Sequence, residues 1–500
     1  MTRWPPVVAL LLAIAAARPA RGTPPAAERP PAVAGQFYPA AAEKLRAGIA
    51  ALLREALPAA GAPPVAIVVP HAGYVYSGQI AADGFSQARD GGYEAVVILG
   101  ANHTSAGFRR IGISPAERFR TPLGAIPVDR RLARDLLAAC PDCVLDEAVH
   151  AREHSIEVQV PFVQQLFPSA PILPVVVASD DLATLRRFGD ALAKALQGRK
   201  ALIVASSDLS HYPASDDAER VDEGTLRSAL RLDPEALQAS LRASLRGDTP
   251  GLETGACGEA PVLVAQFTAR ARGATHGVLV SYANSGRTLI GDASRVVGYG
   301  AVAFVTRVAP PRPTAGVPSE GVTPASLDRR LLAFARSAIE RFLLTETLPL
   351  PRGFGEEAEA RREGVFVTLR KRGQLRGCIG RIVPDLPLPQ LVGTMALRSA
   401  FDDPRFPPLR EDELREIELE VSFLTPLRRV SRPEEVVAGR DGVWLQKAGR
   451  SAVFLPQVAK QEGWDREALL ENLCRKGGLP AGCWRQGATL SVFEARIVAE

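Results

Sequence analysis

The chain has 500 residues, of which 46% are hydrophobic and 23% are charged. This composition is typical of a folded protein, and at ~150 residues per domain the length predicts two or three domains. The formal net charge is only +5, and basic residues are interleaved with acidic ones instead of forming a dense Lys/Arg stripe. The sequence therefore gives no support for nucleic-acid binding.

The first 22 residues show the order of features found in a secretory signal peptide. Arg3 gives a positive start, residues 7–17 form an apolar run, and small residues that suit a signal peptidase follow. The run is too short to cross a bilayer, so we predict export, for example to the periplasm, and no stable membrane span. Residues 23–32 are rich in Pro and Ala and are predicted to be disordered. In the alternative interpretation the leader is not a signal, and the protein stays in the cytoplasm.

Residues 33–307 alternate between strand patterns and helix patterns. The strand patterns are short apolar runs rich in Val and Ile, and amphipathic stretches lie between several of them. This order predicts an α/β domain whose sheet is mainly parallel and is covered by helices on both faces. The principal predicted strands are residues 65–69, 95–99, 172–177 and 201–204.

Residues 308–326 separate this domain from a second one. They are rich in Pro, Gly and Ser and poor in large apolar side chains, so they predict a linker. A helix pattern over residues 327–344 follows, and strand-like runs come later. We therefore expect a second domain over residues 327–499.

Three histidines come directly after predicted strands: His71, His103 and His211. The carboxyl ends of parallel strands meet at one edge of a sheet, where α/β proteins bind ligands. His154 lies just before an amphipathic stretch, between two glutamates that suit orienting hydrogen bonds. Asp208, three residues before His211, is a candidate acid or base. We expect these side chains to line a common cleft.

Cys257 lies between Gly255 and Gly258 and precedes a predicted helix. A thiol at the N-terminus of a helix faces unpaired N–H groups, which predicts a lowered pKa. A thiolate together with neutral imidazoles is a good set of ligands for a transition metal.

The motifs PHAGYVYSG, LGANHTSAG, EHSIEVQVPF, SSDLSHY and GACGEAP occur in this order. With them, residues 33–307 resemble the Memo family. The resemblance implies the fold of the class III extradiol dioxygenases, non-haem Fe(II) enzymes that cleave aromatic rings. It also implies a metal site at His71, His103 and Cys257, with Asp208 and His211 beside it and His154 in the same cleft.

Cys257, the third candidate ligand, changes the chemistry that this resemblance implies. Ring-cleaving relatives bind iron through two histidines and a carboxylate, whereas a thiolate donates more strongly and can itself be oxidised. We therefore expect Fe(II) or copper and redox chemistry, on an unknown substrate. Two alternatives stay open. A non-catalytic adaptor would bind a small molecule or peptide in the same cleft, and a metal-assisted hydrolase would use His154, Asp208 and His211 as acid/base groups.

The motifs LRGCIG, SAFDDPRFPPL, EVSFLTPL and FLPQVAKQEGWDREALLENLCRKGGL give the C-terminal part a resemblance to the AMMECR family. This resemblance implies an α+β fold with no assigned reaction. Arg376 and Cys378 have the most chemical potential, because an arginine can stabilise a thiolate or hold an anion. The alternative is that the motif is a packed turn and strand.

Together the two resemblances point to the AmmeMemoRadiSam system, whose third member is a radical-SAM protein. The sequence has no CxxxCxxC cluster motif, so we expect any radical-SAM partner to act in trans. The six cysteines are too sparse to require a disulfide framework. Cys140 and Cys143 form a CxxC that we interpret as a surface pair, with a local disulfide as the alternative, and Cys474 is predicted to be a core residue.

Overall fold

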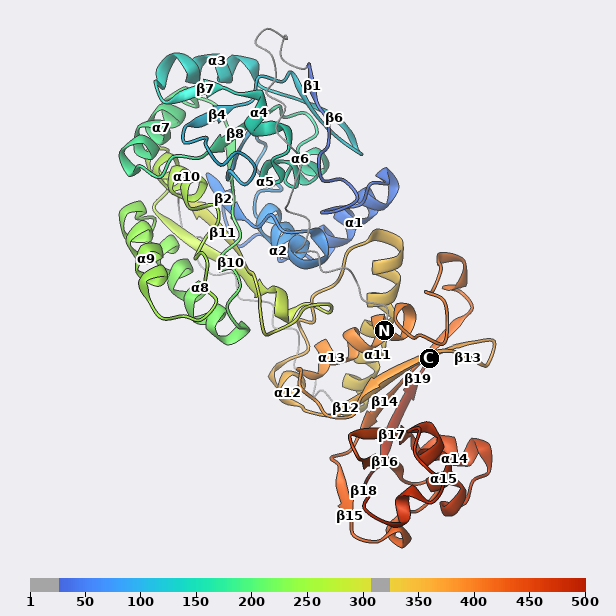
Figure 1. Ribbon diagram of the computed structural model, residues 1–500. Coiled ribbons are helices and arrows are strands. Elements are labelled where there is room, and N and C mark those ends of the chain that lie inside the picture. Colours follow the sequence, from blue (N-terminus) through green and yellow to red (C-terminus); the bar gives the residue numbers. More distant parts are fainter. Residues whose placement is uncertain (1–26, 307–323) are drawn as a thin grey trace. The chain divides into compact units, whose positions relative to one another are not determined.

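The structure is a computed structural model that describes residues 27–306 and 324–500 (Figure 1). The chain forms two compact units. Over the described residues, the first unit contains residues 27–306 and Arg341–Leu350, and the second contains residues 324–340 and Pro351–Glu500. Most of the predicted linker, residues 308–326, lies outside the described residues. Helix α11 (Pro324–Thr345) begins before the predicted end of this linker.

A sheet of eight strands, counted over the described residues, forms the centre of the first unit. Its four central strands β2, β9, β3 and β8 run parallel, and antiparallel pairs join them on both sides. The sheet is therefore mixed, with a parallel centre. In spatial order its strands are β10 (His276–Asn284), β11 (Gly298–Val305), β2 (Ala66–Val69), β9 (Ala201–Ser206), β3 (Ala95–Gly100), β8 (Ile172–Val177), β4 (Ile111–Ile113) and β7 (Cys143–Leu145).

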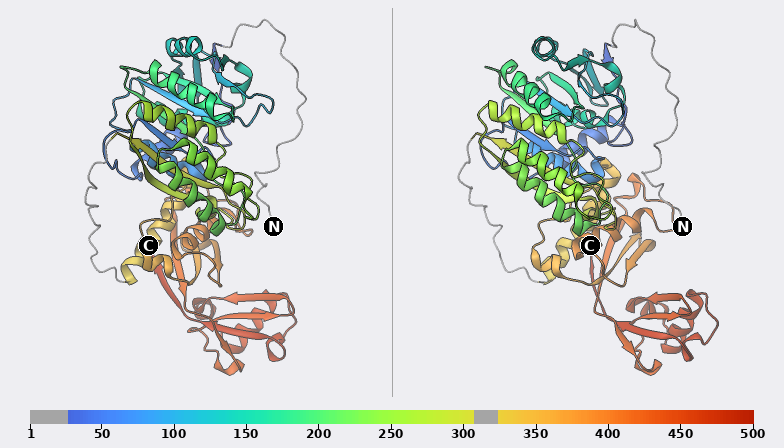
Figure 2. Two further views of the ribbon diagram at one scale, coloured as in Figure 1. Left: turned by 90° about the vertical axis from the view of Figure 1, so that its left-hand side faces the viewer. Right: turned by 60° about the vertical axis from the view of Figure 1, so that its left-hand side comes forward.

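Helices cover both faces of this sheet, which is why its central strands are apolar on both sides (Figures 1 and 2). Successive side chains of a strand point to opposite faces, so Val97 and Val96 of β3 enter two different cores. The core that contains Val97 also receives α3 (Arg130–Ala139), α7 (Leu182–Ala195), α8 (Ser215–Leu230), α9 (Pro234–Arg246) and α10 (Glu259–Ala271). The core that contains Val96 also receives α1 (Ala42–Arg54), α2 (Tyr74–Ser86) and α6 (Val160–Leu166).

The predicted disordered segment, residues 23–32, is ordered where the structure describes it. Strand β1 (Glu28–Arg29) pairs with β5 (Arg118–Thr121), which pairs with β6 (Gly124–Pro127) in a small separate sheet. Arg29 is only 5% exposed and forms a buried ion pair with Glu157. The Pro- and Ala-rich composition predicts disorder, but one arginine with a buried partner fixes the backbone around it.

The second unit separates its helices from antiparallel strands, as α+β folds do. Its first sheet has the order β13 (Gln374–Arg381), β12 (Gly364–Lys371), β14 (Ile417–Leu424) and β19 (Ala495–Ala499). Its second sheet has the order β15 (Arg428–Val430), β18 (Thr489–Phe493), β16 (Gly442–Lys447) and β17 (Arg450–Phe454). Besides the part of α11 up to Glu340, its helices are α12 (Glu356–Ala360), α13 (Leu388–Phe401), α14 (Pro456–Glu462) and α15 (Arg466–Lys476).

Four cysteines form two disulfides, one in each unit. Cys140 and Cys143 are bonded to each other and buried, so the interpretation of this CxxC as a surface pair is wrong. Cys474 is buried in the core, as predicted, but it is bonded to Cys483. Among the described residues the free cysteines are Cys257 and Cys378.

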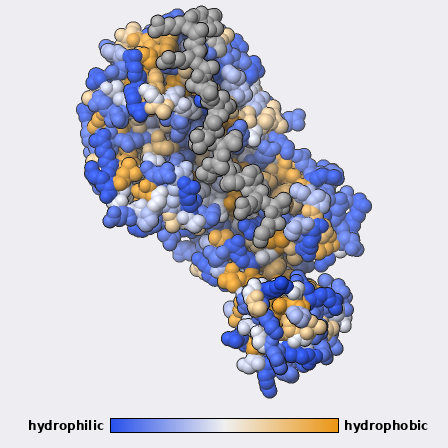
Figure 3. All heavy atoms as spheres, viewed as in Figure 1, coloured by the Kyte–Doolittle hydropathy of each residue, from blue (hydrophilic) through white to orange (hydrophobic). Residues whose placement is uncertain are grey.

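The predicted signal peptide, residues 1–22, lies outside the described residues. Within residues 27–306 and 324–500, no helix combines the length and the apolar character that crossing a membrane requires. On the face seen in Figure 3, hydrophilic and hydrophobic residues are interspersed.

Candidate metal centre

The parallel strands bring the predicted histidines to one edge of the sheet. His71 follows β2 and His103 follows β3, while Asp208 and His211 follow β9, which lies between these two strands. Cys257 lies just before α10, which packs against the same strands. The strand order therefore explains why residues so far apart in the sequence meet here.

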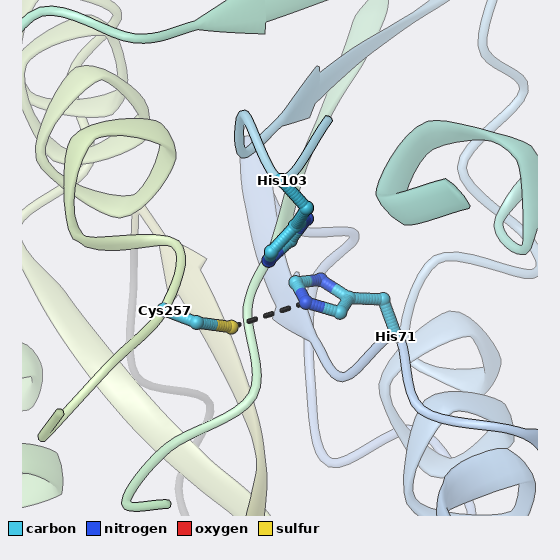
Figure 4. Close-up of side chains that lie close together, drawn as sticks. All are labelled: His71, His103 and Cys257. Carbon is cyan, nitrogen blue, oxygen red and sulfur yellow. Dashed lines mark hydrogen bonds between the residues drawn. The ribbon is translucent and has the colours of Figure 1, made fainter. Parts of the chain in front are cut away.

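His71, His103 and Cys257 converge on one point (Figure 4). Their nearest ligand atoms all lie within 4.8 Å of one another, and Sγ of Cys257 is 3.1 Å from Nε2 of His71. The two imidazole rings have their centroids 5.0 Å apart. Ligands at ~2.0–2.3 Å from a common ion lie at most ~4.6 Å apart, so this set needs only a small adjustment to hold one metal ion.

A hydrogen-bond network selects the ring nitrogen of His71 that faces the thiol. The Ser206 hydroxyl donates to the carbonyl of Ser155 at 2.6 Å, so its oxygen is left to accept from Nδ1 of His71, 3.1 Å away. Nδ1 therefore carries the proton, and the lone pair on Nε2 points toward Cys257. Gln159 donates to the same Ser206 oxygen and to the carbonyl of Pro70, which holds the network in place.

Glu153 supports His103 in the same way. Its Oε1 is 2.9 Å from Nδ1 of His103, and its Oε2 accepts the backbone N–H of His103 at 2.7 Å. Burial raises the pKa of Glu153, but the hydrogen bond and charge of His103 outweigh it and lower the pKa to about 2. A carboxylate behind a histidine is the usual support for a metal ligand. Oε1 of Glu153 lies 3.5 Å from Nδ1 of His154, which is farther than its 2.9 Å distance from Nδ1 of His103.

Burial keeps three histidines of the site, His71, His154 and His211, neutral. His71 is 2% exposed, and burial, followed by the charges of neighbouring histidines, lowers its pKa well below the usual value. Burial and then His103 lower the pKa of both His154 and His211 to about 4. Neutral imidazole is the form that binds a metal ion, so these side chains are ready to do so near neutral pH.

The thiol of Cys257 differs from the sequence-based expectation. Its position before α10 predicts a lowered pKa, but burial, and after it the charge of Asp208, raises the pKa well above the usual value. Desolvation of the thiolate therefore outweighs the dipole of the helix. A divalent cation at this point would reverse the balance, because a coordinating thiol is deprotonated by the metal.

Asp208, His211 and His154 surround the three candidate ligands. Asp208 accepts the backbone N–H of His71 at 2.7 Å, and burial raises its pKa to about 6 although this bond opposes the shift. His211 forms a second ligand group with Asp208 and Cys257. Its Nε2 is buried without a hydrogen-bond partner among the described residues. His154 lies against Phe37 and His103, with ring centroids 4.7 and 4.6 Å away.

Sequence reasoning missed the supporting residues Ser206 and Gln159. Both lie within motifs that it singled out, SSDLSHY and EHSIEVQVPF. Ser206 is the last residue of β9. It lies near His71 because β9 pairs in parallel with β2, the strand that His71 follows. The strand order would have been needed to find it.

In the second unit, Arg376 and Cys378 both lie on β13. Arg376 gives two hydrogen bonds to Glu413, at 3.0 and 2.9 Å. Gly377 lies between Arg376 and Cys378 and leaves no room for a side chain. A Cβ there would be 2.1 Å from the carbonyl oxygen of Ser399 on α13. The glycine thus serves the packing of strand on helix, and Arg376 is occupied by a carboxylate.

These features define the class of the first unit: an α/β protein with a His-His-Cys cluster at the carboxyl edge of parallel strands. Comparison with known families gives the family. The model of the Memo-like proteins matches residues 29–303, and that of AMMECR1 matches residues 332–498. The chain belongs to the Memo family and carries an AMMECR1 domain after the Memo part.

Two relatives agree with the assignment to the Memo family. The chain is 37% identical to a MEMO1 family protein of Methanopyrus kandleri over 289 residues, which are 55% of this chain and 99% of the relative. It is 38% identical over 278 residues to a MEMO1 family protein of Aquifex aeolicus, with shares of 55% and 99%. A solved structure of an uncharacterized protein from Pyrococcus horikoshii is 37% identical, with a TM-score of 0.34, over 35% of this chain and 91% of that chain.

Proposed function

We propose that the first unit is a metal-binding redox domain related to the class III extradiol dioxygenases, with Fe(II) or copper held by His71, His103 and Cys257. The observation that carries this proposal is the convergence of two imidazoles and one thiol, with ligand atoms within 4.8 Å of one another. Ser206 and Glu153 hold the outer nitrogens of the two rings, which supports a binding role for the inner ones.

The donor set itself favours these metals. Two imidazole nitrogens and one soft sulfur suit copper and iron better than magnesium or calcium, which prefer oxygen. Three protein ligands also leave open positions at which a substrate or dioxygen can bind. An ion held here supplies Lewis acidity and one-electron redox chemistry.

The surrounding side chains can bind the substrate and handle its protons. Asp208, with a pKa of about 6, can hold or release a proton near neutral pH. Nε2 of His211 is buried without a partner among the described residues, so a ligand bound next to it can satisfy it. His154 contributes a third imidazole, which burial keeps neutral, next to His103.

The metal content of anaerobically purified protein tests the proposal. We expect about one equivalent of iron or copper in the wild type, and its loss in Cys257→Ser. Cys378→Ser is the matched control, because it removes the other free thiol, in the second unit, and should keep the metal. A wild type that stays metal-free after incubation with Fe(II) or Cu(I) would contradict the proposal.

Metal-assisted hydrolysis is the second candidate. It is favoured by the raised pKa of Asp208 and by the buried, unpartnered Nε2 of His211 among the described residues, since both groups suit general acid/base catalysis. A hydrolase would turn over its substrate at the same rate with and without dioxygen. Oxygen-dependent turnover would exclude it.

We also propose that the protein works in an oxidising compartment, as the signal-like leader predicts. The disulfides Cys140–Cys143 and Cys474–Cys483 support this, because disulfides persist outside the cytosol and are rare inside it. Alkylation of thiols in intact cells, followed by mass spectrometry, tests it. Four reduced cysteines at these positions would favour the cytoplasm, where a radical-SAM partner acting in trans could be met.

A further inference from the structure

A small cavity lies in the core of the first unit, between the sheet and three of the helices that cover it. Its walls come from β2 and β11 on one side and from α8, α9 and α10 on the other. Its volume is about 20 Å³. A single water molecule needs ~10–15 Å³, so the cavity can hold one small guest. The large apolar side chains that line it are Val68, Leu209, Leu226, Leu237, Leu241 and Val262.

The polar side chains in the wall of this cavity make hydrogen bonds with groups of the protein. The Ser207 hydroxyl donates to the backbone carbonyl of the next residue at 2.7 Å. The Thr225 hydroxyl donates to the carbonyl of Val221 at 3.2 Å, and Glu259 accepts from the amide of Gln238 at 3.1 Å. A buried water molecule needs about two to four polar partners, and cavities with apolar walls stay dry. We therefore expect no ordered water in this cavity.

The cavity shares one wall with the metal centre. At the end of β9 and just after it, successive side chains point to opposite sides. Ser206 lies 3.1 Å from Nδ1 of His71, and Asp208 accepts the backbone N–H of His71 at 2.7 Å. Ser207 and Leu209, which alternate with them, line the cavity. The backbone of this segment therefore separates the candidate metal centre from the cavity.

The loop that carries Cys257 forms another part of the same wall. The N–H of Cys257 donates to the carbonyl of Asp208 at 3.3 Å, and the preceding residue, Ala256, lines the cavity. Gly258 permits the close approach of the two segments, because a Cβ there would lie 2.4 Å from the carbonyl oxygen of Ser206. The wall between the cavity and the candidate ligand Cys257 is thus built from closely packed backbone.

We propose that this cavity binds dioxygen and holds it beside the metal centre. Dioxygen is small and apolar, so it enters an apolar cavity without the loss of hydrogen bonds that water would suffer there. The inference rests on the proposed function, in which dioxygen binds at an open position of the metal. It assigns to Ala229, Leu237, Leu241 and Val262, on the three helices, the role of limiting the size of the guest.

Xenon is a suitable probe, because it is apolar and scatters X-rays strongly. We would collect diffraction data from crystals of the full-length protein under xenon pressure. We expect a xenon peak enclosed by Leu237, Leu241 and Val262. Ala229→Leu should abolish the peak, because the larger side chain fills the space. Ala239→Leu, at an exposed position of α9, is the matched control and should keep the peak.

A variant with the opposite effect covers the case in which Ala229→Leu does not fold. Leu237→Ala removes buried atoms from the wall and enlarges the cavity, so it should strengthen the xenon peak. A wild-type cavity that takes up no xenon, or that holds an ordered water molecule instead, overturns the proposal.

Dioxygen itself gives a second measurement, because it is paramagnetic and speeds the relaxation of protons that it contacts. We would record methyl relaxation of the full-length protein without added metal, with and without dioxygen pressure. The methyl groups of Leu237 and Leu241 should gain more relaxation than those of Leu192, a fully buried leucine of the same core that does not line the cavity. Equal gains at the three leucines would overturn the proposal.

Neither measurement requires a bound metal ion, so the two proposals fail separately. A protein that binds xenon and dioxygen but no metal would contradict the proposed function and leave the gas site in place. A protein that binds metal but neither gas would contradict this inference alone.

Discussion

Glu153 holds His103 at two points: its Oε1 is 2.9 Å from the ring nitrogen Nδ1, and its Oε2 accepts the backbone N–H at 2.7 Å. One carboxylate thus fixes both the main chain and the ring plane of a candidate metal ligand. Glu153 is 1% exposed, so water competes little for these bonds. The orientation of His103 therefore depends on a residue outside the set formed by His71, His103 and Cys257.

Glu153→Gln should weaken metal binding. The amide keeps the shape of the side chain but removes the charge that supports the imidazole, and loss of such support typically costs about 10- to 100-fold in metal affinity. Titration against a chelator of known affinity measures this. Glu147→Gln, on the exposed side of the neighbouring helix α4 (Glu147–Ala151), is the control. Equal affinities of the two variants would show that Glu153 is only structural.

Arg29→Met should destabilise the first unit by about 3–5 kcal/mol, because it leaves the buried Glu157 carboxylate without its cation. Glu157 also accepts from the backbone N–H groups of Ala32 and Val33, at 2.8 and 3.0 Å. Urea unfolding followed by far-UV circular dichroism reports the loss. In the double variant Arg29→Met/Glu157→Gln the uncompensated charge is gone, so part of the stability should return. No recovery would mean that packing of the arginine dominates.

Asp222 predicts a pH dependence of stability. Burial raises its pKa to about 6, although Ser210 and Tyr282 donate hydrogen bonds that oppose the shift. The native carboxyl thus binds its proton more tightly than the unfolded chain does. Stability should therefore fall as pH rises from about 4 to about 6. The shift corresponds to roughly 3 kcal/mol.

Asp222→Asn should remove this part of the pH profile, because the amide does not titrate. Urea unfolding at several pH values between about 4 and 7 measures the slope that linkage predicts. Asp216→Asn, at an exposed position of the same helix α8, is the control and should keep the wild-type profile. A wild-type profile in Asp222→Asn would assign the slope to other groups.

Removal of the Cys474–Cys483 disulfide should destabilise the second unit. The bond closes a short loop, with a sequence separation of 9, and the chain-entropy argument gives about 2–3 kcal/mol for such a loop. Trp464 and Trp484 pack against the same core, so their fluorescence reports its unfolding in the double alanine variant. The double alanine variant of Cys140 and Cys143 should leave this transition in place, because that disulfide lies in the first unit.

Sequence patterns were sufficient to predict those structural features that depend on a short segment of the chain. The Val- and Ile-rich runs marked strands such as β2, β3 and β9, and the parallel edge rule then placed His71 and His103 together. The motifs that resemble the Memo and AMMECR families were equally local, and both families are confirmed.

Features that depend on distant partners were not predictable in this way. The partner of Cys474 was missed because helical periodicity predicts burial and says nothing of what lies opposite. The composition of residues 23–32 predicts disorder and does not indicate that Arg29 has a buried partner, Glu157. For Cys257 the local rule of the helix N-terminus gave the wrong direction of the pKa shift, because burial is a property of the whole fold.

Four cysteines are paired in disulfides, so the two remaining thiols can report on the state of the protein. Each unit retains one reduced sulfur, Cys257 in the first and Cys378 in the second. A thiol-reactive label therefore reads the two units separately, without any engineered cysteine. Protection of Cys257 by a bound metal ion can then be followed in a single digest of the unmodified protein, with Cys378 as the internal reference.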